Sequence, residues 1–391
     1  MDPIAARDLF PLTRRFIFMN HAGVSPISDR SRAALASLIE EQATKPHLSG
    51  TGQEMADRLR CAIGNLVGAE PDTIGITRGT AHGTSLLAQG LDWREGDNVV
   101  GALREHPATI FPWMALRDRG VELRLAALDN GRVTPESVLS LVDDRTRVVA
   151  LSHVQFWNGY RIDLERIGTE LDKRAVVFAV DGIHSVGALD LDLSKLPVDY
   201  LSAGACAWQL GPQGVGFCYC RPELLSRLRP ALVGSNSVQN PTEYFEYEHE
   251  YELCGTARRF EESNPSLLDM SGYLAAIELL LEVGSEVVEK RVLMLSERLA
   301  EGLAERKYEL VEPWPREARE SSGIVSFRRP GASAGQVLRE LNAAGVVGRV
   351  HSDFVRLSPH FYNTQAEVDR VLDVLVPHDV TMAGSAGTSS T

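Results

Sequence analysis

Between about residues 28 and 260, short apolar runs alternate with segments in which apolar residues recur every three or four positions. The apolar runs predict buried strands, because strands covered on both faces of a sheet have continuous hydrophobic sequences. These predicted strands are 98–103, 147–154, 175–182 and 215–220. The segments 35–42 and 82–91 have helical periodicity. Strands alternating with helices favour parallel strands joined by crossover helices, so we predict an open α/β sheet that is mainly parallel.

The pattern changes after residue 260. Two long helical stretches, 266–284 and 286–306, precede short predicted strands at 323–329 and 353–359 and a last helix at 365–375. This order is typical of an α+β unit. We therefore divide the chain into an N-terminal segment that lines a ligand site, a large domain, a smaller C-terminal domain and a disordered tail, at 1–27, 28–260, 261–379 and 380–391.

Composition narrows the classes of protein. A chain of 391 residues exceeds one comfortable core, which agrees with a large and a small domain. Its 40 basic against 53 acidic residues, a net charge of -13, argue against binding nucleic acid or an anionic membrane and favour a small-molecule substrate. Neither a signal-peptide pattern nor an apolar run of roughly 18 residues is present, so we expect a cytoplasmic protein.

The five cysteines show no metal-type pair and are too few for a disulfide framework. We expect no metal site, and we expect most of these cysteines to be buried thiols. They are Cys61, Cys206, Cys218, Cys220 and Cys254.

Candidate chemistry follows two of the predicted strands. Asp181 comes directly after the apolar residues 175–180 of a predicted strand, and ligands in an open α/β sheet collect beyond the carboxyl ends of strands. A turn-forming Asp-Gly pair is an equally good interpretation of this position. Gly79, Thr80 and Ala81 lie where a strand turns into a helix, so their N–H groups are free to bind an anion. An ordinary helix cap is the alternative there.

Two further side chains could contact a ligand. His106 follows a strand and presents a flat ring that could stack on an aromatic cofactor, although a loop histidine is the commoner case. Arg356 ends a predicted strand of the small domain and could bind a carboxylate through two hydrogen bonds, or form a surface ion pair. The glycine string at 211–216 has the wrong order for a dinucleotide fingerprint and precedes a strand, which disfavours a nicotinamide site.

Seven segments in order carry a family resemblance. They are TRGTAHGTSLLAQGLDW, EHPATIFPW, SHVQFWNGYRIDL, VDGIHSVGALDLDL, AWQLGPQGVGF, GTARRFEE and VRLSPHFYN. Together they make the chain, from Met19 to Asn363, resemble fold-type I pyridoxal-phosphate (PLP) enzymes of the class V aminotransferase group. Within that group, the chain is most similar to the branch of isopenicillin N epimerase and the cysteine desulfurases.

The resemblance implies PLP as the cofactor and a role for each candidate residue. Asp181 pairs with the pyridine nitrogen, His106 stacks on the ring, and His184 and Gln155 lie near the ring hydroxyl. The phosphate is bound by Gly79, Thr80, Ala81 and Ser202, and Thr256 of the partner subunit completes the site in a homodimer that shares its active sites. Arg356 receives the α-carboxylate of an amino-acid substrate, and Asn20 and His21 line the same pocket. No role follows for Arg258 and Arg259.

One position departs from the family pattern. The family has Gly-x-x-Lys-Trp, whereas this chain has Gly204, Ala205, Cys206, Ala207 and Trp208. The family lysine forms the Schiff base with the cofactor and moves protons, which alanine cannot do, so we expect a trapped external aldimine with little turnover. Either Ala207 replaces the lysine of a competent enzyme, or the chain is a natural non-catalytic pseudoenzyme. The retained Asp181 favours the first, because a buried charge without a partner is costly.

The reaction stays open among several kinds. A desulfurase needs a cysteine shortly before the carboxylate-binding arginine, and residues 340–357 contain none. We therefore expect chemistry on an S-substituted cysteine in secondary metabolism of the lincosamide type, by C–S β-elimination or by decarboxylation coupled to oxidative deamination. An aminotransferase or an amino-acid epimerase of the same fold is the alternative. The aromatic and acidic segment 234–253 is either a substrate-recognition loop or a solvated loop.

Overall fold

The computed structural model describes residues 1–46, 52–239, 252–263 and 265–376. The predicted tail and most of the segment 234–253 lie outside the described residues.

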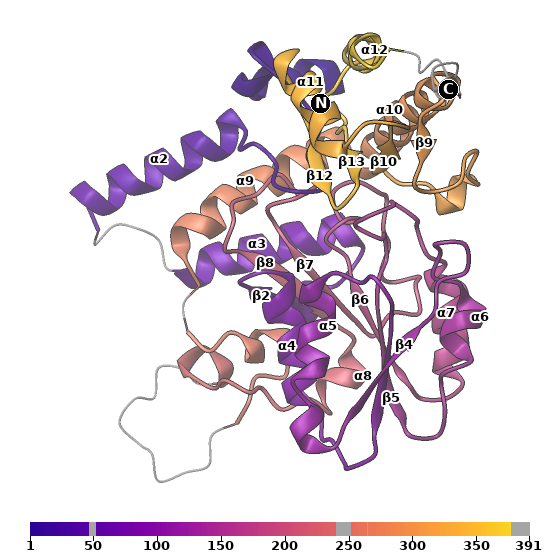
Figure 1. The fold of residues 1–391 in the computed structure, drawn as a ribbon. Coiled ribbons are helices and arrows are strands. Elements are labelled where there is room, and N and C mark those ends of the chain that lie inside the picture. The colour runs from indigo at the N-terminus through magenta and orange to yellow at the C-terminus, as the bar shows by residue number, and fades with distance from the viewer. Residues whose placement is uncertain (47–51, 240–251, 264, 377–391) are drawn as a thin grey trace, which may run out of the picture.

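A seven-stranded sheet forms the centre of the molecule, in the order β2-β8-β7-β6-β5-β3-β4 (Figure 1). Its strands are β2 (Ile74–Thr77), β3 (Asn98–Ala102), β4 (Glu122–Ala126), β5 (Thr146–Ser152), β6 (Val177–Asp181), β7 (Tyr200–Gly204) and β8 (Gly216–Cys220). The mainly parallel α/β sheet predicted from the sequence is confirmed. The run at 215–220 is a strand, but β8 is antiparallel to both of its neighbours. Only residues 205–215 join β7 to β8, which leaves no room for the crossover helix that a parallel strand requires.

Helices cover both faces of this sheet. Successive strand residues point to opposite faces, so Val100 and Val149 belong to one core whereas Val99 and Val148 belong to the other. The first core also includes residues of α3 (Gly52–Val67), α6 (Pro135–Leu139), α7 (Leu164–Asp172) and α9 (Leu267–Val283). The second includes residues of α4 (Thr80–Gly90), α5 (Pro107–Met114) and α8 (Pro222–Leu225).

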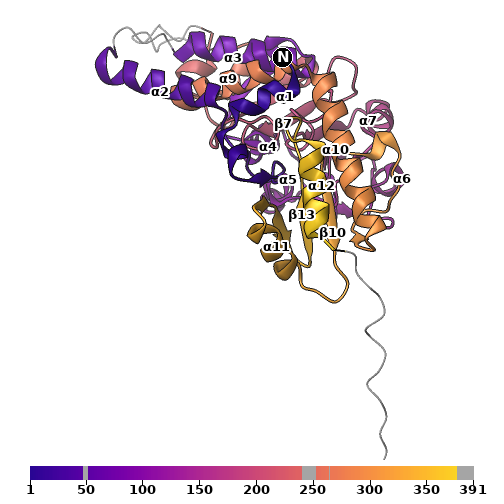
Figure 2. The ribbon, with the colours of Figure 1, turned by 90° about the horizontal axis from the view of Figure 1, so that it is seen from above.

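The C-terminal part of the chain builds a second sheet, antiparallel throughout, in the order β12-β13-β10-β9. These strands are β9 (Glu309–Leu310), β10 (Val325–Arg328), β12 (Arg349–His351) and β13 (Phe354–Leu357). Figure 2 shows three helices gathered around this sheet, α10 (Ser285–Glu305), α11 (Ala334–Ala343) and α12 (Gln365–Val374). Their apolar residues form a third core with those of the sheet.

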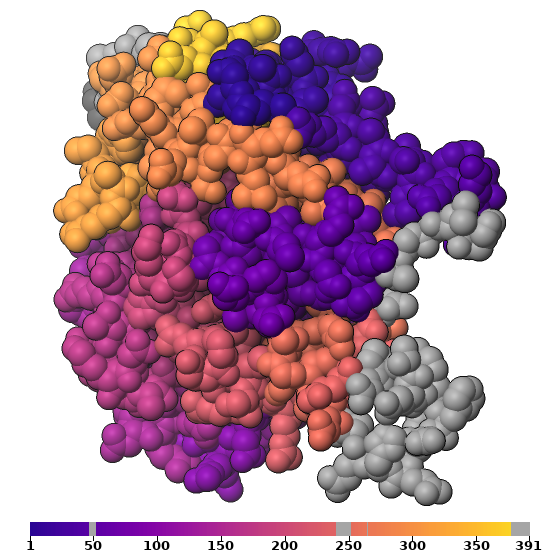
Figure 3. Space-filling view, turned by 180° about the vertical axis from the view of Figure 1, so that it is seen from behind, coloured from indigo at the N-terminus to yellow at the C-terminus, as the bar shows by residue number. Residues whose placement is uncertain are grey.

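Helix α9 lies beyond the predicted domain boundary at residue 261, yet it packs against α3 and α2 (Asp29–Thr44) and shares a core with the large sheet. Helix α2 buries only Ser31 and Leu38, and Figure 3 shows it extending away from the rest of the molecule. The domain limits drawn from the sequence remain a prediction.

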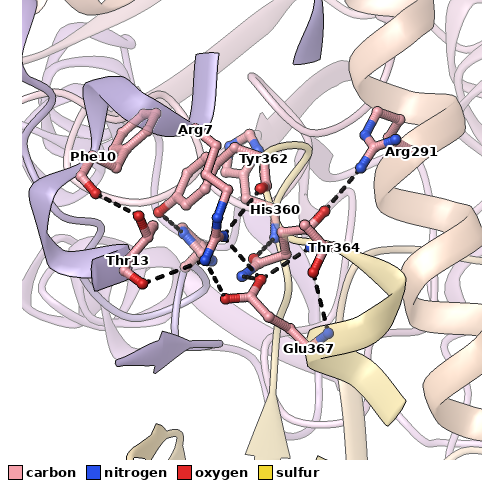
Figure 4. Close-up of polar contacts among 10 residues, drawn as sticks. Arg7, Phe10, Thr13, Arg291, His360, Tyr362, Thr364 and Glu367 are labelled. Carbon is pink, nitrogen blue, oxygen red and sulfur yellow. Dashed lines mark hydrogen bonds and ion pairs between the residues drawn. The ribbon is translucent and has the colours of Figure 1, made fainter. Parts of the chain in front are cut away.

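The N-terminal segment is held by the C-terminal part of the chain. After the short helix α1 (Pro3–Ala6), strand β1 (Ile17–Phe18) pairs in parallel with β11 (Val346–Val347). The Arg7 guanidinium forms two hydrogen bonds with the Glu367 carboxylate, at 2.7 and 3.0 Å (Figure 4). Farther along, the Ser25 N–H donates to the Cys206 carbonyl at 2.8 Å, so the segment contacts both parts of the molecule.

All five cysteines are free thiols, and three of them, Cys218, Cys220 and Cys254, are buried. Among the described residues, no helix combines the length and apolar character needed to cross a membrane.

Candidate active site

A cavity of about 330 Å³ lies at the carboxyl end of β6, between the large sheet, the N-terminal segment and the strands β12 and β13. Six residues predicted from the sequence line it, namely Asn20, Thr80, His106, Asp181, His184 and Arg356. The other lining residues were not predicted, and they include an aromatic ring, a second guanidinium and a third imidazole, those of Phe156, Arg349 and His351. Residues from six separate stretches of the chain therefore meet at one site.

Asp181 is a buried carboxylate without a cationic partner. One oxygen accepts a hydrogen bond from the Thr109 hydroxyl at 2.7 Å, and the other accepts one from the Ile183 N–H at 3.0 Å. No lysine, arginine or histidine of the described residues forms an ion pair with it. Burial raises the pKa of Asp181 to about 6. A cation bound in the cavity would relieve this cost of burying the charge.

Arg356 is the opposite case, a guanidinium that is 3% exposed. Its Nη1 donates to the Phe156 carbonyl at 2.7 Å, whereas its Nε has no hydrogen-bond partner. Burial, and to a smaller extent the nearby charge of Arg349, lowers the pKa of Arg356 to about 10. No carboxylate of the described residues forms an ion pair with it, so the group is available to bind an anionic ligand.

Three histidines around the cavity are held in the neutral form. Burial lowers the pKa of His106 and of His184, and it lowers the pKa of His351 to about 4, with Arg356 as the second cause for His351. His106 caps helix α5 by accepting the Ala108 N–H at 3.2 Å. The buried atoms Nδ1 of His184 and Nε2 of His351 have no partner. The cavity therefore offers neutral imidazoles that can share a hydrogen bond with a ligand.

The start of α4 forms the candidate anion site. Gly79 has a φ of 135°, which favours glycine, and a Cβ there would meet no atom within 4 Å. The Thr80 hydroxyl accepts the Gly204 N–H at 3.0 Å, and the Ser202 hydroxyl donates to the Thr80 carbonyl at the same distance. These contacts fix the first turn of the helix against β7, with open space beside Gly79 in which an anion could approach the start of the helix.

Gln155 lies in a buried network behind the cavity. Its Nε2 donates to the Glu105 carboxylate at 2.8 Å, while its own Oε1 is buried and has no partner. Glu105 also accepts the Ser152 N–H at 2.9 Å, and burial raises the pKa of this carboxyl. Sequence reasoning missed Glu105, although it directly precedes His106.

His21 does not line the cavity, in contrast to the sequence-based expectation. Its ring is fully buried, with Nδ1 2.8 Å from the Ser358 carbonyl and Nε2 2.6 Å from the Tyr362 hydroxyl. Tyr362 stacks on Phe10, and His360 contacts the Trp208 carbonyl at 2.8 Å through Nε2. His21 thus belongs to a buried cluster that joins the N-terminal segment to the turn after β7.

Ala207 lies in that turn, and its side chain is completely buried. It belongs to the core that also contains Trp208 and Tyr273, and its carbonyl accepts the Leu210 N–H at 3.2 Å. The chain contains five lysines, all within the described residues, and none of them lines the cavity: Lys45, Lys173, Lys195, Lys290 and Lys307.

Thr256 begins the short helix at Ala257–Phe260 and lies outside the cavity of its own chain. Arg258 and Arg259, for which the sequence indicates no role, form hydrogen bonds with backbone carbonyls of this region. Arg258 donates to the Val238 carbonyl at 3.0 Å, and Arg259 donates to the carbonyls of Cys254 at 2.7 Å and Leu225 at 3.0 Å.

The groups without partners fit PLP. Asp181 lacks the cation that a protonated pyridine nitrogen supplies, and the open first turn of α4 suits a phosphate. A mainly parallel sheet with this site at its carboxyl edge is the architecture of a fold-type I PLP enzyme. The chain belongs to the aminotransferase class-V family, whose model matches residues 40–371, and its cofactor is PLP.

Known relatives agree with this assignment. The chain is 27% identical to a probable cysteine desulfurase of Pyrococcus abyssi, over 95% of this chain and 96% of that protein. It is also 27% identical to isopenicillin N epimerase of Streptomyces clavuligerus, over 81% of this chain and 83% of that protein.

Among solved structures, the cystine C-S lyase C-DES in complex with its product cysteine persulfide is similar, with a TM-score of 0.85 and 25% identity over 94% of this chain and 98% of that one. A second structure of C-DES, in which alanine replaces a lysine and glycine is covalently linked to the PLP cofactor, has a TM-score of 0.86 at the same identity and coverage.

Proposed function

We propose that the chain is a PLP-dependent enzyme of S-substituted cysteines that cleaves their C–S bond by β-elimination. The observation that carries the proposal is the pairing, in one cavity, of a carboxylate without a cation and a guanidinium without an anion, Asp181 and Arg356. An amino-acid substrate with a PLP cofactor supplies the missing partner of each.

The predicted residues have complementary tasks in this proposal. With PLP bound, Asp181 would hold a proton on the pyridine nitrogen, His106 would stack on the ring, and His184 and Gln155 would lie near the ring hydroxyl. The phosphate is held by Gly79, Thr80, Ala81 and Ser202, with Thr256 of the partner subunit. When bound, the cofactor withdraws electrons from the bonds at the substrate α-carbon.

Arg356 binds and orients the substrate. Because it is almost fully buried, few water molecules compete with a carboxylate for its N–H groups, so a charge-assisted pair there is stronger than one at the surface. Asn20, whose buried Oδ1 has no partner, faces the same cavity and can accept a hydrogen bond from the substrate.

The choice of a C–S lyase over a desulfurase depends on the cysteines. A desulfurase stores the sulfur on a cysteine of its own, yet none of the five cysteines lines the cavity. The similarity to the C-S lyase C-DES supports release of the sulfur with the leaving group instead. Decarboxylation coupled to oxidative deamination, transamination and epimerisation are the competing reactions, and the similarity to isopenicillin N epimerase favours the last of these.

We further propose that Ala207 occupies the position of the Schiff-base lysine, so that the present chain retains an amino acid without turning it over. The C-DES variant with alanine for lysine and glycine on its cofactor supports this idea. A pseudoenzyme that uses the cofactor only for binding is the competing explanation.

The test is the Ala207→Lys variant, loaded with PLP and incubated with a panel of S-alkyl cysteines. We expect a visible absorption band and the formation of pyruvate. The matched control is Ala207→Met, which adds a side chain of similar length without an amine and is expected to remain inactive.

The products separate the competing reactions. Carbon dioxide indicates decarboxylation, a changed optical rotation indicates epimerisation, and amino transfer to a keto acid indicates an aminotransferase. A lysine variant that binds PLP but converts no amino acid supports the pseudoenzyme, and one that converts only amino acids without sulfur contradicts the cysteine-conjugate substrate.

A further inference from the structure

A second arginine faces the cavity, and the proposed reaction does not use it. Arg349 of β12 is the cross-strand partner of Arg356 of β13, and both side chains line the cavity. Arg356 is buried, whereas Arg349 is exposed. Arg356 therefore lies deep in the cavity, and Arg349 lies near its opening.

The placement of Arg349 opposite Arg356 lowers the stability of the sheet, and no other group of the described chain compensates for it. Like charges placed directly opposite each other on paired strands destabilise a sheet. Within the described part of the chain, the Arg349 guanidinium forms no hydrogen bond and no ion pair. Two partly buried arginines of the same region are paired, Arg328 with Asp353 and Arg329 with Glu340. An anion from outside the chain is the group that would compensate Arg349.

The charged residues around the cavity indicate which kind of anion would pair with Arg349. The cavity lining includes one carboxylate, that of Asp181, and two guanidiniums, those of Arg349 and Arg356, whereas burial lowers the pKa of each of its three histidines. Asp181 matches the cofactor nitrogen and Arg356 matches the α-carboxylate of the substrate. One positive charge is left, at the outer side of the cavity.

We propose that Arg349 binds a second acidic group of the substrate, carried on the sulfur substituent. The substrate class is then an S-substituted cysteine that ends in a carboxylate or another anion. This inference rests on the proposed function and specifies which S-substituted cysteines the enzyme prefers. With the α-carboxylate on Arg356, the substituent lies toward the opening, beside Phe156 and His351, whose rings are 5.8 Å apart.

Binding to the PLP-loaded chain with Ala207 in place tests the inference without turnover. Two isosteric ligands are compared by calorimetry, S-(2-carboxyethyl)cysteine and its amide, S-(2-carbamoylethyl)cysteine. We expect the acid to bind about tenfold more tightly, because a charge-assisted hydrogen bond replaces a neutral one. Arg349→Gln should remove this preference, and Arg349→Lys should keep most of it.

Arg339→Gln is the matched control, because Arg339 is an exposed arginine of α11 outside the cavity and its loss changes the net charge equally. Equal affinity for the acid and the amide, or a preference that survives Arg349→Gln, overturns the inference and leaves the proposed function intact. A weaker affinity of Arg349→Gln for PLP itself also overturns it, because the guanidinium then serves the cofactor phosphate. If neither ligand binds, the proposed function is wrong and the inference with it.

Discussion

Asp181 and Arg356 each keep a charge out of water without a partner in the chain. Such groups reduce the stability of the ligand-free protein, since the desolvation of an ion is costly unless an opposite charge compensates it. Their presence is therefore stronger evidence for a bound ligand than their residue types are. Replacing either side chain by a neutral one should therefore raise the stability of the ligand-free protein and weaken the binding of its ligand.

The Asp181→Asn variant tests this at one residue. The folded protein retains the Asp181 proton up to a pKa of about 6, whereas an ordinary aspartate loses it near 3.8. The folded state thus binds the extra proton between these values, and stability falls as the pH rises through that window, by about 3 kcal/mol in total. The amide side chain of the variant carries no charge, so the ligand-free variant should lack this fall and be more stable than the parent at pH 7.5. Urea unfolding of the parent and the variant at pH 4 to 8 measures this difference in the free energy of unfolding.

The same variant should bind PLP at least about tenfold more weakly, because the cofactor nitrogen loses its counter-charge. Asp97→Asn is the matched control, a buried aspartate that is paired with Arg147 at 3.0 Å. It should lose stability at pH 7.5 and keep its affinity for PLP. Unchanged PLP binding by the Asp181 variant would contradict the assigned role.

At the scale of elements, the N-terminal segment depends on Arg7. Its guanidinium binds Glu367 and also approaches the carbonyls of Thr13 and Tyr362 at 3.4 Å (Figure 4). Arg7→Ala leaves the Glu367 carboxylate without its cation and should lower the free energy of unfolding by about 1 to 2 kcal/mol. Because Asn20 and β1 lie on the same segment, limited proteolysis should cleave the variant faster before residue 20.

Arg14→Ala is the control for this prediction, because Arg14 is an exposed arginine of the same segment. Equal rates of cleavage in the two variants would show that the ion pair does not hold the segment.

Long or strongly apolar elements could be predicted from the sequence, and very short ones could not. The runs that became β3, β5, β6 and β8 were identified because they are covered on both faces. The two-residue pairing of β1 with β11 has no period to detect, since it depends on contacts of residues 17 and 18 with residues 346 and 347.

The length of the surrounding element also explains which site residues could be predicted from the sequence. Asp181, Thr80 and Arg356 adjoin predicted strands or the helix that follows one. Arg349 and His351 were missed because β12 has only three residues, none of them buried. His21 was misplaced because its partners Ser358 and Tyr362 are more than 300 residues away in sequence.

At the scale of the whole molecule, exposed apolar side chains in the described part of the chain offer a face to the proposed second copy. Phe111 and Met114 of α5 are 61% and 52% exposed, and Val24 beside the cavity is 44% exposed. These apolar side chains lie on elements that also contribute to the cavity lining. A homodimer that covers them would enclose the site, as the family resemblance implies.

The proposal that two subunits share their active sites predicts that Thr256 contacts the cofactor of the other subunit. The PLP-loaded chain should sediment at twice its mass of 42.9 kDa. Thr256→Val should weaken binding of PLP about tenfold and leave binding of pyridoxal, which lacks the phosphate, unchanged, because only the phosphate loses a hydrogen bond. Phe111→Glu, which places a charge on the proposed interface, should yield monomers with the same selective loss. Monomers that bind PLP as tightly as the parent would show that each chain holds its cofactor alone, and that Thr256 has no part in the site.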